Sequence, residues 1–133
     1  MSTQFGQRRT RQRDVIHEII SSSPGPLTVE DIHQQAQNDL NIGIATVYRT
    51  ITLLLENNEI QKSNFSDGLA RYESVHKKSH HHHFLCRLCK KATCINVCPV
   101  SEIKVEKLNK DFIVESHELI IHGLCKICSE KKS

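Results

Sequence analysis

The sequence contains no tryptophan, and its aromatic content is only 5%. Large aromatic side chains supply much of the buried surface in a typical core, so this chain has little apolar area of that kind to bury. At 133 residues, 38% of them hydrophobic, the chain is long enough for one domain or two small ones. We therefore expect small domains that need a further stabilising link, such as a bound metal ion.

Long hydrophobic runs are also missing. No apolar stretch is long enough to span a bilayer, and the segment at 1–5 does not begin a signal peptide. We therefore expect a cytoplasmic protein with no membrane partner. In that compartment, the six cysteines are better explained as metal ligands or redox thiols than as structural disulfides.

Motifs of the common enzyme classes are absent as well. The chain has no Gly-rich phosphate loop, no Ser/His/Asp ordering and no HExxH motif. We therefore predict that the protein is not an enzyme and has no small-molecule substrate.

Acidic residues are missing from the N-terminal segment before Asp14. Four arginines lie there instead: Arg8, Arg9, Arg11 and Arg13. The net charge of +3 is mild, so the placement of these charges is more informative than their sum. The cluster fits either the solvated start of a helix or an arm that contacts nucleic-acid phosphates, with Arg11 as a candidate contact.

The first half of the chain carries three helical patterns. Apolar residues recur on one helical face from Arg11 to Ile20, and the proline- and glycine-containing segment at 21–26 ends that helix. Thr28, with Asp31 three residues later, has the spacing of a capping box and starts a second helix. A third helix runs from about Ile44 to Asn57. Three short helices separated by turns favour a helix-turn-helix arrangement.

The third helix has an apolar back and a polar front. Its apolar stripe consists of Val47, Ile51, Leu54 and Leu55. Arg49 falls opposite this stripe, with Thr46 beside it and Tyr48 at one edge. Such a face suits a DNA major groove, where arginine binds guanine and Thr or Tyr contacts a thymine methyl group or a phosphate. An ordinary amphipathic helix has the same pattern, so this helix alone leaves both interpretations open.

A predicted hairpin follows the third helix. Two extended runs, at 60–65 and 69–75, flank an Asp67-Gly68 turn. A hairpin placed after such a helix is typical of a winged helix. In that fold Lys62 and Arg71 are candidates for contact with the phosphate backbone of double-stranded DNA.

Four of the six cysteines form two CxxC pairs that are far apart in the sequence. One pair is Cys86 and Cys89, and the other is Cys125 and Cys128. A single CxxC pair could be a redox site, but two pairs together supply the four thiolates of a closed tetrahedral zinc site. We therefore predict that these four residues bind a structural Zn²⁺ ion.

Several motifs occur in one order along nearly the whole chain. They are Thr10–Arg13, Ala45–Thr50, Asp67–Glu73, the His-rich run before Cys86, and His117 followed by Gly123–Cys128. In this order they resemble the ferric uptake regulator family. The resemblance implies a metal-responsive repressor that binds an operator as a homodimer. It also implies an α+β fold, with a winged-helix DNA-binding domain at 1–76 and a small α/β metal-binding dimerisation domain at 77–133.

The His-rich run divides between two sites by strand alternation. In a strand, His81 and His83 face one side, whereas His80 and His82 face the other. The resemblance implies a regulatory Zn²⁺ or Fe²⁺ site built from Glu73, His81 and His83, and we add Cys94 to this set as a candidate fourth ligand. It implies a second possible site built from His80, His82, Glu102 and His117.

Two positions depart from the family pattern and bear on the choice of metal. Pro26 stands where iron- and peroxide-sensing relatives usually carry a histidine, and Cys94 stands where many relatives carry a carboxylate. A thiolate in place of an oxygen ligand favours Zn²⁺ over Fe²⁺. Cys98 is open to three interpretations: a further thiolate ligand, a disulfide partner of Cys94, or a small buried apolar residue.

The sequence therefore predicts a zinc-responsive repressor and leaves several alternatives. Within the family these are an iron-responsive or a peroxide-responsive regulator. A thiol redox sensor using Cys94 and Cys98 is a different class, as is a zinc-ribbon protein or oxidoreductase that does not bind DNA. The patterned third helix and the Asp-Gly hairpin speak against the last class.

Overall fold

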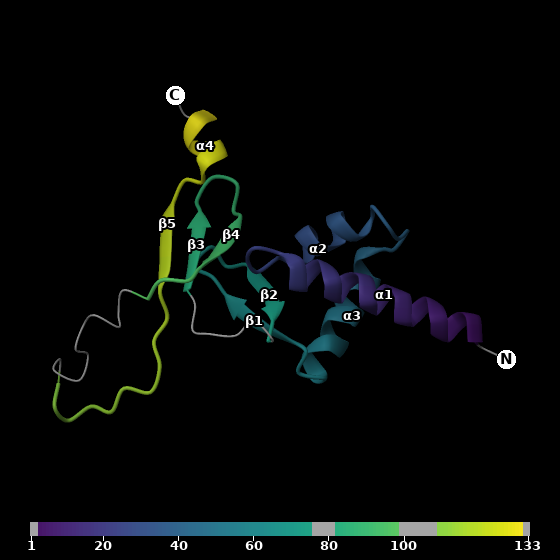
Figure 1. The fold of residues 1–133 in the computed structure, drawn as a ribbon, viewed down its shortest axis with the longest axis horizontal. Coiled ribbons are helices and arrows are strands. Elements are labelled where there is room, and N and C mark those ends of the chain that lie inside the picture. Colours follow the sequence, from purple (N-terminus) through teal and green to yellow (C-terminus); the bar gives the residue numbers. More distant parts are fainter. Residues whose placement is uncertain (1–2, 76–81, 99–108, 132–133) are drawn as a thin grey trace. The chain divides into compact units, whose positions relative to one another are not determined.

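The computed structural model describes residues 3–75, 82–98 and 109–131, with the backbone alone for residues 3–10. The chain divides into two compact units, Met1–Lys78 and Ser79–Ser133 (Figure 1). Helices dominate the first unit and strands the second, so the predicted α+β class is confirmed. None of the described helices is long and apolar enough to cross a membrane.

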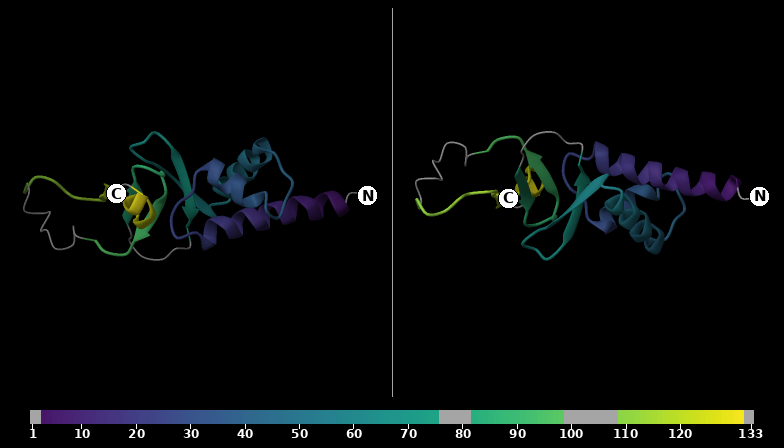
Figure 2. Two further views of the ribbon diagram at one scale, coloured as in Figure 1. Left: turned by 90° about the horizontal axis from the view of Figure 1, so that it is seen from above. Right: turned by 90° about the horizontal axis from the view of Figure 1, so that it is seen from below.

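Three helices and a two-stranded hairpin form the first unit. They are α1 (Thr3–Ser22), α2 (Val29–Ala36), α3 (Ile44–Glu56), β1 (Ile60–Asn64) and β2 (Ala70–Ser74). Both views in Figure 2 show α2 and α3 on the same side of α1. We call the β1–β2 hairpin the wing, and an isolated antiparallel bridge between Leu27 and Tyr72 joins it to the segment that precedes α2. This is the winged-helix layout expected for the N-terminal half.

The core of the first unit lies between the three helices. Buried residues from α3 are Val47, Ile51 and Leu54, as the apolar stripe predicted. They pack in one cluster with Ile16 and Ile20 from α1. Burial of such side chains contributes roughly 1.5–3 kcal/mol each, which makes this stripe the main support of α3.

Local signals start α2 and close the wing as predicted. The Thr28 hydroxyl accepts a hydrogen bond from the Asp31 amide at 3.1 Å, and the Asp31 carboxylate accepts one from the Thr28 amide at 3.1 Å. This capping box satisfies two amide groups at the start of the helix. In the turn of the wing, Gly68 has a φ of 81°, a conformation that glycine adopts without strain. The prediction for α1 was too short, because this helix begins at Thr3 rather than near Arg11.

A three-stranded sheet and a short helix form the second unit. They are β3 (His82–Cys86), β4 (Ala92–Ile95), β5 (Ile120–Gly123) and α4 (Lys126–Lys131). The strand order is β4-β3-β5, with β3 antiparallel to β4 and parallel to β5. The central strand β3 therefore places the His-rich run at its start and the first CxxC pair at its end.

Candidate metal centres and nucleic-acid interface

The polar face of α3 is exposed while its back is buried. Tyr48 is 53% exposed, and Arg49 is also exposed. The Arg49 guanidinium donates a hydrogen bond to the Thr46 hydroxyl at 3.1 Å, so the two side chains lie side by side near the start of the helix. This face carries the hydrogen-bond donors of Arg49, the hydroxyl of Thr46 and the ring of Tyr48, which could contact a partner outside the unit.

Two further basic residues of the predicted DNA-binding set are exposed. Lys62 lies on β1 of the wing, and its side chain is open to solvent. Arg11 lies on α1 and donates to the backbone carbonyl of Asp39 at 3.4 Å. Both positions leave a positive charge at the surface, where a phosphate could approach.

Arg71 has a different placement from the one expected of a phosphate contact. Its side chain is fully buried, and its two terminal nitrogens donate to the two carboxylate oxygens of Asp67 at 3.0 and 2.8 Å. The guanidinium also lies 4.7 Å from the centre of the Phe65 ring. Arg71 therefore braces the turn of the wing from within and does not present its charge to an external phosphate. Sequence reasoning took Asp67 only as a turn residue and so missed this pair.

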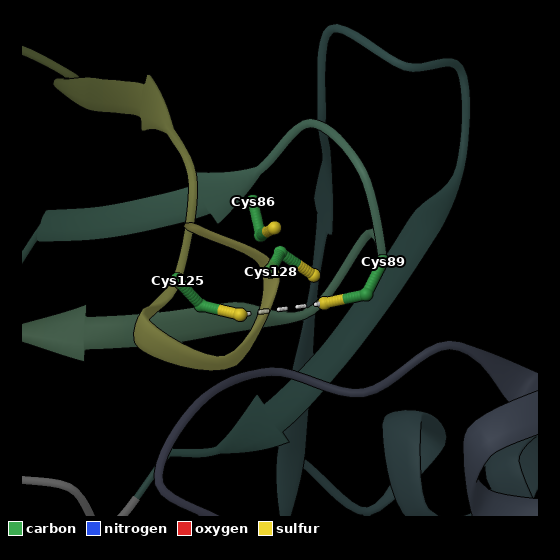
Figure 3. Close-up of side chains that lie close together, drawn as sticks. All are labelled: Cys86, Cys89, Cys125 and Cys128. Atoms are coloured by element: carbon green, nitrogen blue, oxygen red, sulfur yellow. Dashed lines mark hydrogen bonds between the residues drawn. The ribbon is translucent and has the colours of Figure 1, made fainter. Parts of the chain in front are cut away.

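The four predicted zinc ligands converge in the second unit. Their sulfur atoms all lie within 4.8 Å of one another, and Figure 3 shows the side chains of Cys86, Cys89, Cys125 and Cys128 pointing toward a common centre. The sulfurs of Cys89 and Cys125 are 3.9 Å apart. A tetrahedral ion with Zn–S bonds of about 2.3 Å would separate its sulfurs by about 3.8 Å. The geometry fits a closed four-thiolate site.

Backbone hydrogen bonds shape the loop that carries the first pair. The Lys90 amide donates to the Cys86 carbonyl at 3.0 Å, and Lys90 has a φ of 65°. The Arg87 amide donates to the Gly123 carbonyl at 2.8 Å, which fastens this loop to the segment that leads to the second pair. At Gly123 an added Cβ would lie 3.2 Å from the Phe84 ring, so a side chain there would crowd the approach of β5 to β3. The two pairs are thus held together by the backbone around them.

The thiols of this site differ in acidity. Hydrogen bonds from the backbone of Cys125 and Cys89 lower the pKa of the Cys86 thiol to about 6. Burial raises the pKa of the Cys128 thiol to about 12 and also raises the pKa of the Cys89 thiol. At neutral pH Cys86 is therefore ready to bind as a thiolate, whereas an incoming metal ion must displace the proton of Cys128.

The structure brings two of the four residues predicted for the second possible site into contact, and it adds a cysteine to them. His82 and His117 meet through their Nε2 atoms at 3.2 Å, whereas His80 and Glu102 lie outside the described residues. The sulfur of Cys98 lies 3.2 Å from Nε2 of His82 and 3.3 Å from Nε2 of His117. Cys98, which the sequence left open between three roles, is therefore the third member of a His82–Cys98–His117 cluster.

The residues predicted for the regulatory site fall in both units. In the second unit, His83 on β3 stands directly opposite Cys94 on β4. In the first unit, Glu73 lies on β2 and is 2% exposed, and its carboxylate accepts a hydrogen bond from the side-chain Nε2 of Gln61 at 3.1 Å. His81 lies outside the described residues. The described part of the second unit thus pairs an imidazole with a thiol across two strands.

Comparisons with known proteins agree on one family. Residues 4–122 match the sequence profile of the Ferric uptake regulator family. The chain is 33% identical over 135 aligned positions to the ferric uptake regulation protein of Campylobacter jejuni, with 98% of this chain and 85% of that protein covered.

Solved structures of similar proteins share the fold. A structure described as a zinc-bound manganese uptake regulator matches with a TM-score of 0.73 and 30% identity, covering 86% of this chain and 87% of that one. The Helicobacter pylori ferric uptake regulator, described as having three functional metal binding sites, matches with a TM-score of 0.69 and 30% identity, covering 92% and 83%.

Proposed function

The chain belongs to the ferric uptake regulator family, and from that premise we propose that it is a repressor whose binding to operator DNA is switched on by zinc. Regulators of this family bind operator DNA as dimers and are not enzymes, and this chain is a metal-responsive regulator of that kind. The observation that carries the choice of zinc is the pairing of His83 with Cys94 across β3 and β4. An imidazole beside a thiolate favours a four-coordinate Zn²⁺ site over an oxygen-rich site for Fe²⁺.

The proposed DNA contacts come from the exposed face of α3 and from two basic residues outside it. Arg49 reads a base edge, Thr46 and Tyr48 contact the groove beside it, and Arg11 and Lys62 contact phosphates. The buried, paired guanidinium of Arg71 leaves that residue out of the set. The side chains of these contacts are exposed, except that of Thr46, which is half-buried beside Arg49.

We expect Arg49→Ala to weaken specific operator binding by about 1–3 kcal/mol and to relax the preference at one base pair. Arg49 is exposed and donates a hydrogen bond to Thr46 at the surface of the same helix, so the thermal stability of the protein is expected to change little. Fluorescence anisotropy with a set of single-base operator variants measures both effects.

Arg49→Lys is the matched variant for this test. Lysine keeps the charge but lacks the planar fork that binds O6 and N7 of guanine together. We expect it to keep most of the non-specific affinity and to lose the base preference. Unchanged base preference in both variants would remove Arg49 from base reading.

The proposed regulatory ion is held by Glu73, His81, His83 and Cys94. Glu73 belongs to the wing and the other three belong to the second unit, and what supports this set is the resemblance to the family together with the pairing of His83 with Cys94. A ligand shifts a conformational equilibrium only as far as it binds one form more tightly. The bound ion thus favours the form in which two copies of α3 match successive major-groove half-sites. DNA affinity is expected to rise with metal and to fall with salt.

The choice of zinc is tested with Co²⁺ as a spectroscopic substitute in protein that keeps its structural zinc. The titration is made in a Cys98→Ser background, so that Cys94 is the thiol outside the four-cysteine site. We expect a thiolate-to-cobalt charge-transfer band, which disappears when Cys94→Ser is added. In parallel, Zn²⁺ is expected to restore operator binding of the chelated wild-type protein better than Fe²⁺.

The outcome that would overturn this proposal is the one expected of an iron-responsive regulator. That alternative predicts octahedral cobalt spectra with no sulfur band, because an Fe²⁺ site prefers oxygen and nitrogen ligands in six-coordinate geometry. It also predicts that Fe²⁺ restores operator binding better than Zn²⁺.

A further inference from the structure

The side chains of His82, Cys98 and His117 form a nearly equilateral triangle of ligand atoms. Its edges are 3.2 Å between the two Nε2 atoms, 3.2 Å from His82 to the Cys98 sulfur, and 3.3 Å from that sulfur to His117. The three residues come from the start of β3, the segment after β4 and the segment before β5. We propose that Cys98 is a metal-ligating thiolate, and that it makes this cluster a two-imidazole, one-thiolate site for Zn²⁺, distinct from the regulatory site proposed above.

Hydrogen bonds alone do not account for this triangle. A neutral imidazole nitrogen either carries a proton and donates, or carries a lone pair and accepts. Between two such nitrogens and one thiol, the edge that joins the nitrogens needs one donor and one acceptor. One imidazole N–H and the thiol S–H are then the two protons available for three edges. One edge therefore has no hydrogen bond, or only a weak one with a strongly bent donor angle. Hydrogen bonds among these three atoms therefore do not account for all three short distances.

A tetrahedral metal ion accounts for all three edges at once. With Zn–N bonds of about 2.0–2.1 Å and a Zn–S bond of about 2.3 Å, tetrahedral angles give about 3.3 Å between the nitrogens and about 3.6 Å from each nitrogen to the sulfur. The observed distance of 3.2 Å between the nitrogens is close to the tetrahedral value, and the two nitrogen-to-sulfur distances of 3.2 and 3.3 Å are shorter than it by about 0.3–0.4 Å. At the same bond lengths an octahedral ion with 90° angles would give about 2.9 Å between the nitrogens and about 3.1 Å from each nitrogen to the sulfur, so the choice of coordination geometry rests on the donor set.

The donor set selects the class of metal. A thiolate with two imidazoles is a borderline-to-soft set, which favours Zn²⁺ over Fe²⁺ or Mn²⁺. Metal binding requires loss of the Cys98 thiol proton, and the ion takes up the freed electron pair. A carboxylate in place of Cys98 would leave the site open to oxygen-preferring ions. Cys98 is therefore the residue that decides the specificity of this centre.

This centre is separate from the four-cysteine site. His82 and Cys86 stand at the two ends of β3, which at ~3.3 Å per residue puts them about 13 Å apart. His82 is 3% exposed, whereas Cys98 is half-buried and His117 is exposed. The fourth corner of the tetrahedron can therefore be reached from solvent, and a water molecule or a further ligand can complete the shell. An ion here links the segments around β3, β4 and β5.

The test uses full-length protein that keeps its structural zinc, under reducing and oxygen-free conditions. A Cys94→Ser background removes the thiol of the proposed regulatory site, so any sulfur band beyond the four-cysteine site reports on Cys98. Titration with Co²⁺ is expected to give a thiolate-to-cobalt charge-transfer band together with intense tetrahedral bands in the visible range. Excess Zn²⁺ is expected to displace the cobalt, whereas excess Mn²⁺ is not.

Adding Cys98→Ser is expected to abolish the sulfur band and to weaken Co²⁺ binding at this centre by more than about tenfold. Loss of a residue that only supports a metal ligand already costs about 10–100-fold in affinity, so loss of a direct ligand is expected to cost at least as much. His117→Ala is expected to weaken binding by a similar factor while a sulfur band of altered energy remains. His122→Ala is the matched control, because His122 is an exposed histidine on β5 outside the cluster, and we expect it to leave the titration unchanged. Circular dichroism and zinc content establish that each variant is folded.

A sulfur band that persists in the Cys94→Ser/Cys98→Ser protein would overturn the proposal, as would octahedral cobalt without a sulfur band in the Cys94→Ser protein. These readouts do not involve DNA. If operator binding then responded to Fe²⁺ rather than Zn²⁺ while the Cys98-dependent band was present, the proposed zinc-sensing function would fail and this site would stand.

Discussion

Replacing Cys89 with serine is expected to unfold the Ser79–Ser133 unit and to leave the chain monomeric. The described part of this unit buries few apolar side chains, among them Leu85 and Ala92. A core of that size contributes only a few kcal/mol. Binding of structural zinc is worth about 10–16 kcal/mol in small zinc domains at neutral pH, and that free energy is part of the folding free energy. Loss of one of four thiolates therefore removes the main source of stability.

Three measurements test this substitution. Metal analysis reports the loss of zinc, native mass spectrometry reports the monomeric state, and circular dichroism reports the unfolding of the second unit. Leu88→Ser is the matched control, because Leu88 lies in the same loop, is 55% exposed and receives the same new residue. We expect it to remain a folded dimer that contains zinc. The first unit has its own buried cluster, so its helical signal is expected to survive in Cys89→Ser. A Cys89→Ser protein that stayed a dimer with full zinc content would contradict the assignment.

The parts of this structure that the sequence predicted are those set by local spacing. The i, i+4 and i+7 pattern of Val47, Ile51 and Leu54 fixes which side of α3 faces the core, whatever packs against it. The capping box of Thr28 and Asp31 is likewise complete within four residues. Each CxxC pair is a short loop that holds two thiols near one point, and two such pairs have few other uses.

The parts that could not be predicted are of two kinds. Some depend on contacts between distant segments, and others depend on a residue that could serve either of two structural roles. Cys98 meets His82 and His117 from 16 and 19 residues away, and no local pattern fixes those pairings. Arg71 was expected at the surface, in contact with the phosphate backbone, because it lies in the predicted hairpin of a winged helix, whereas a buried arginine needs a partner. The partner was present as Asp67, but an Asp-Gly turn gives its aspartate a sufficient local role, so the ion pair was not foreseen.

That ion pair leads to the second large expected effect. Asp67→Ala is expected to destabilise the first unit by about 3–5 kcal/mol, because it leaves the Arg71 guanidinium buried without its counter-charge. The guanidinium is fully buried, and the Asp67 side chain is only 10% exposed. Asp67 also accepts a hydrogen bond from the Leu69 amide at 3.0 Å, which adds about 1 kcal/mol to the loss. Urea denaturation followed by the helical signal measures the change in the free energy of unfolding.

A double variant separates the charge effect from damage to the turn. In Asp67→Ala/Arg71→Met both charges are gone and an apolar side chain of similar length packs beside Phe65, so we expect most of the lost stability to return. Asp67→Asn keeps an oxygen for the Leu69 amide but no charge, and it is expected to fall between Asp67→Ala and the wild type. A loss below about 1 kcal/mol in Asp67→Ala, typical of an exposed ion pair, would show that the Arg71 charge reaches water. In that case the account of Arg71 as a guanidinium that is buried and neutralised by Asp67 would be wrong.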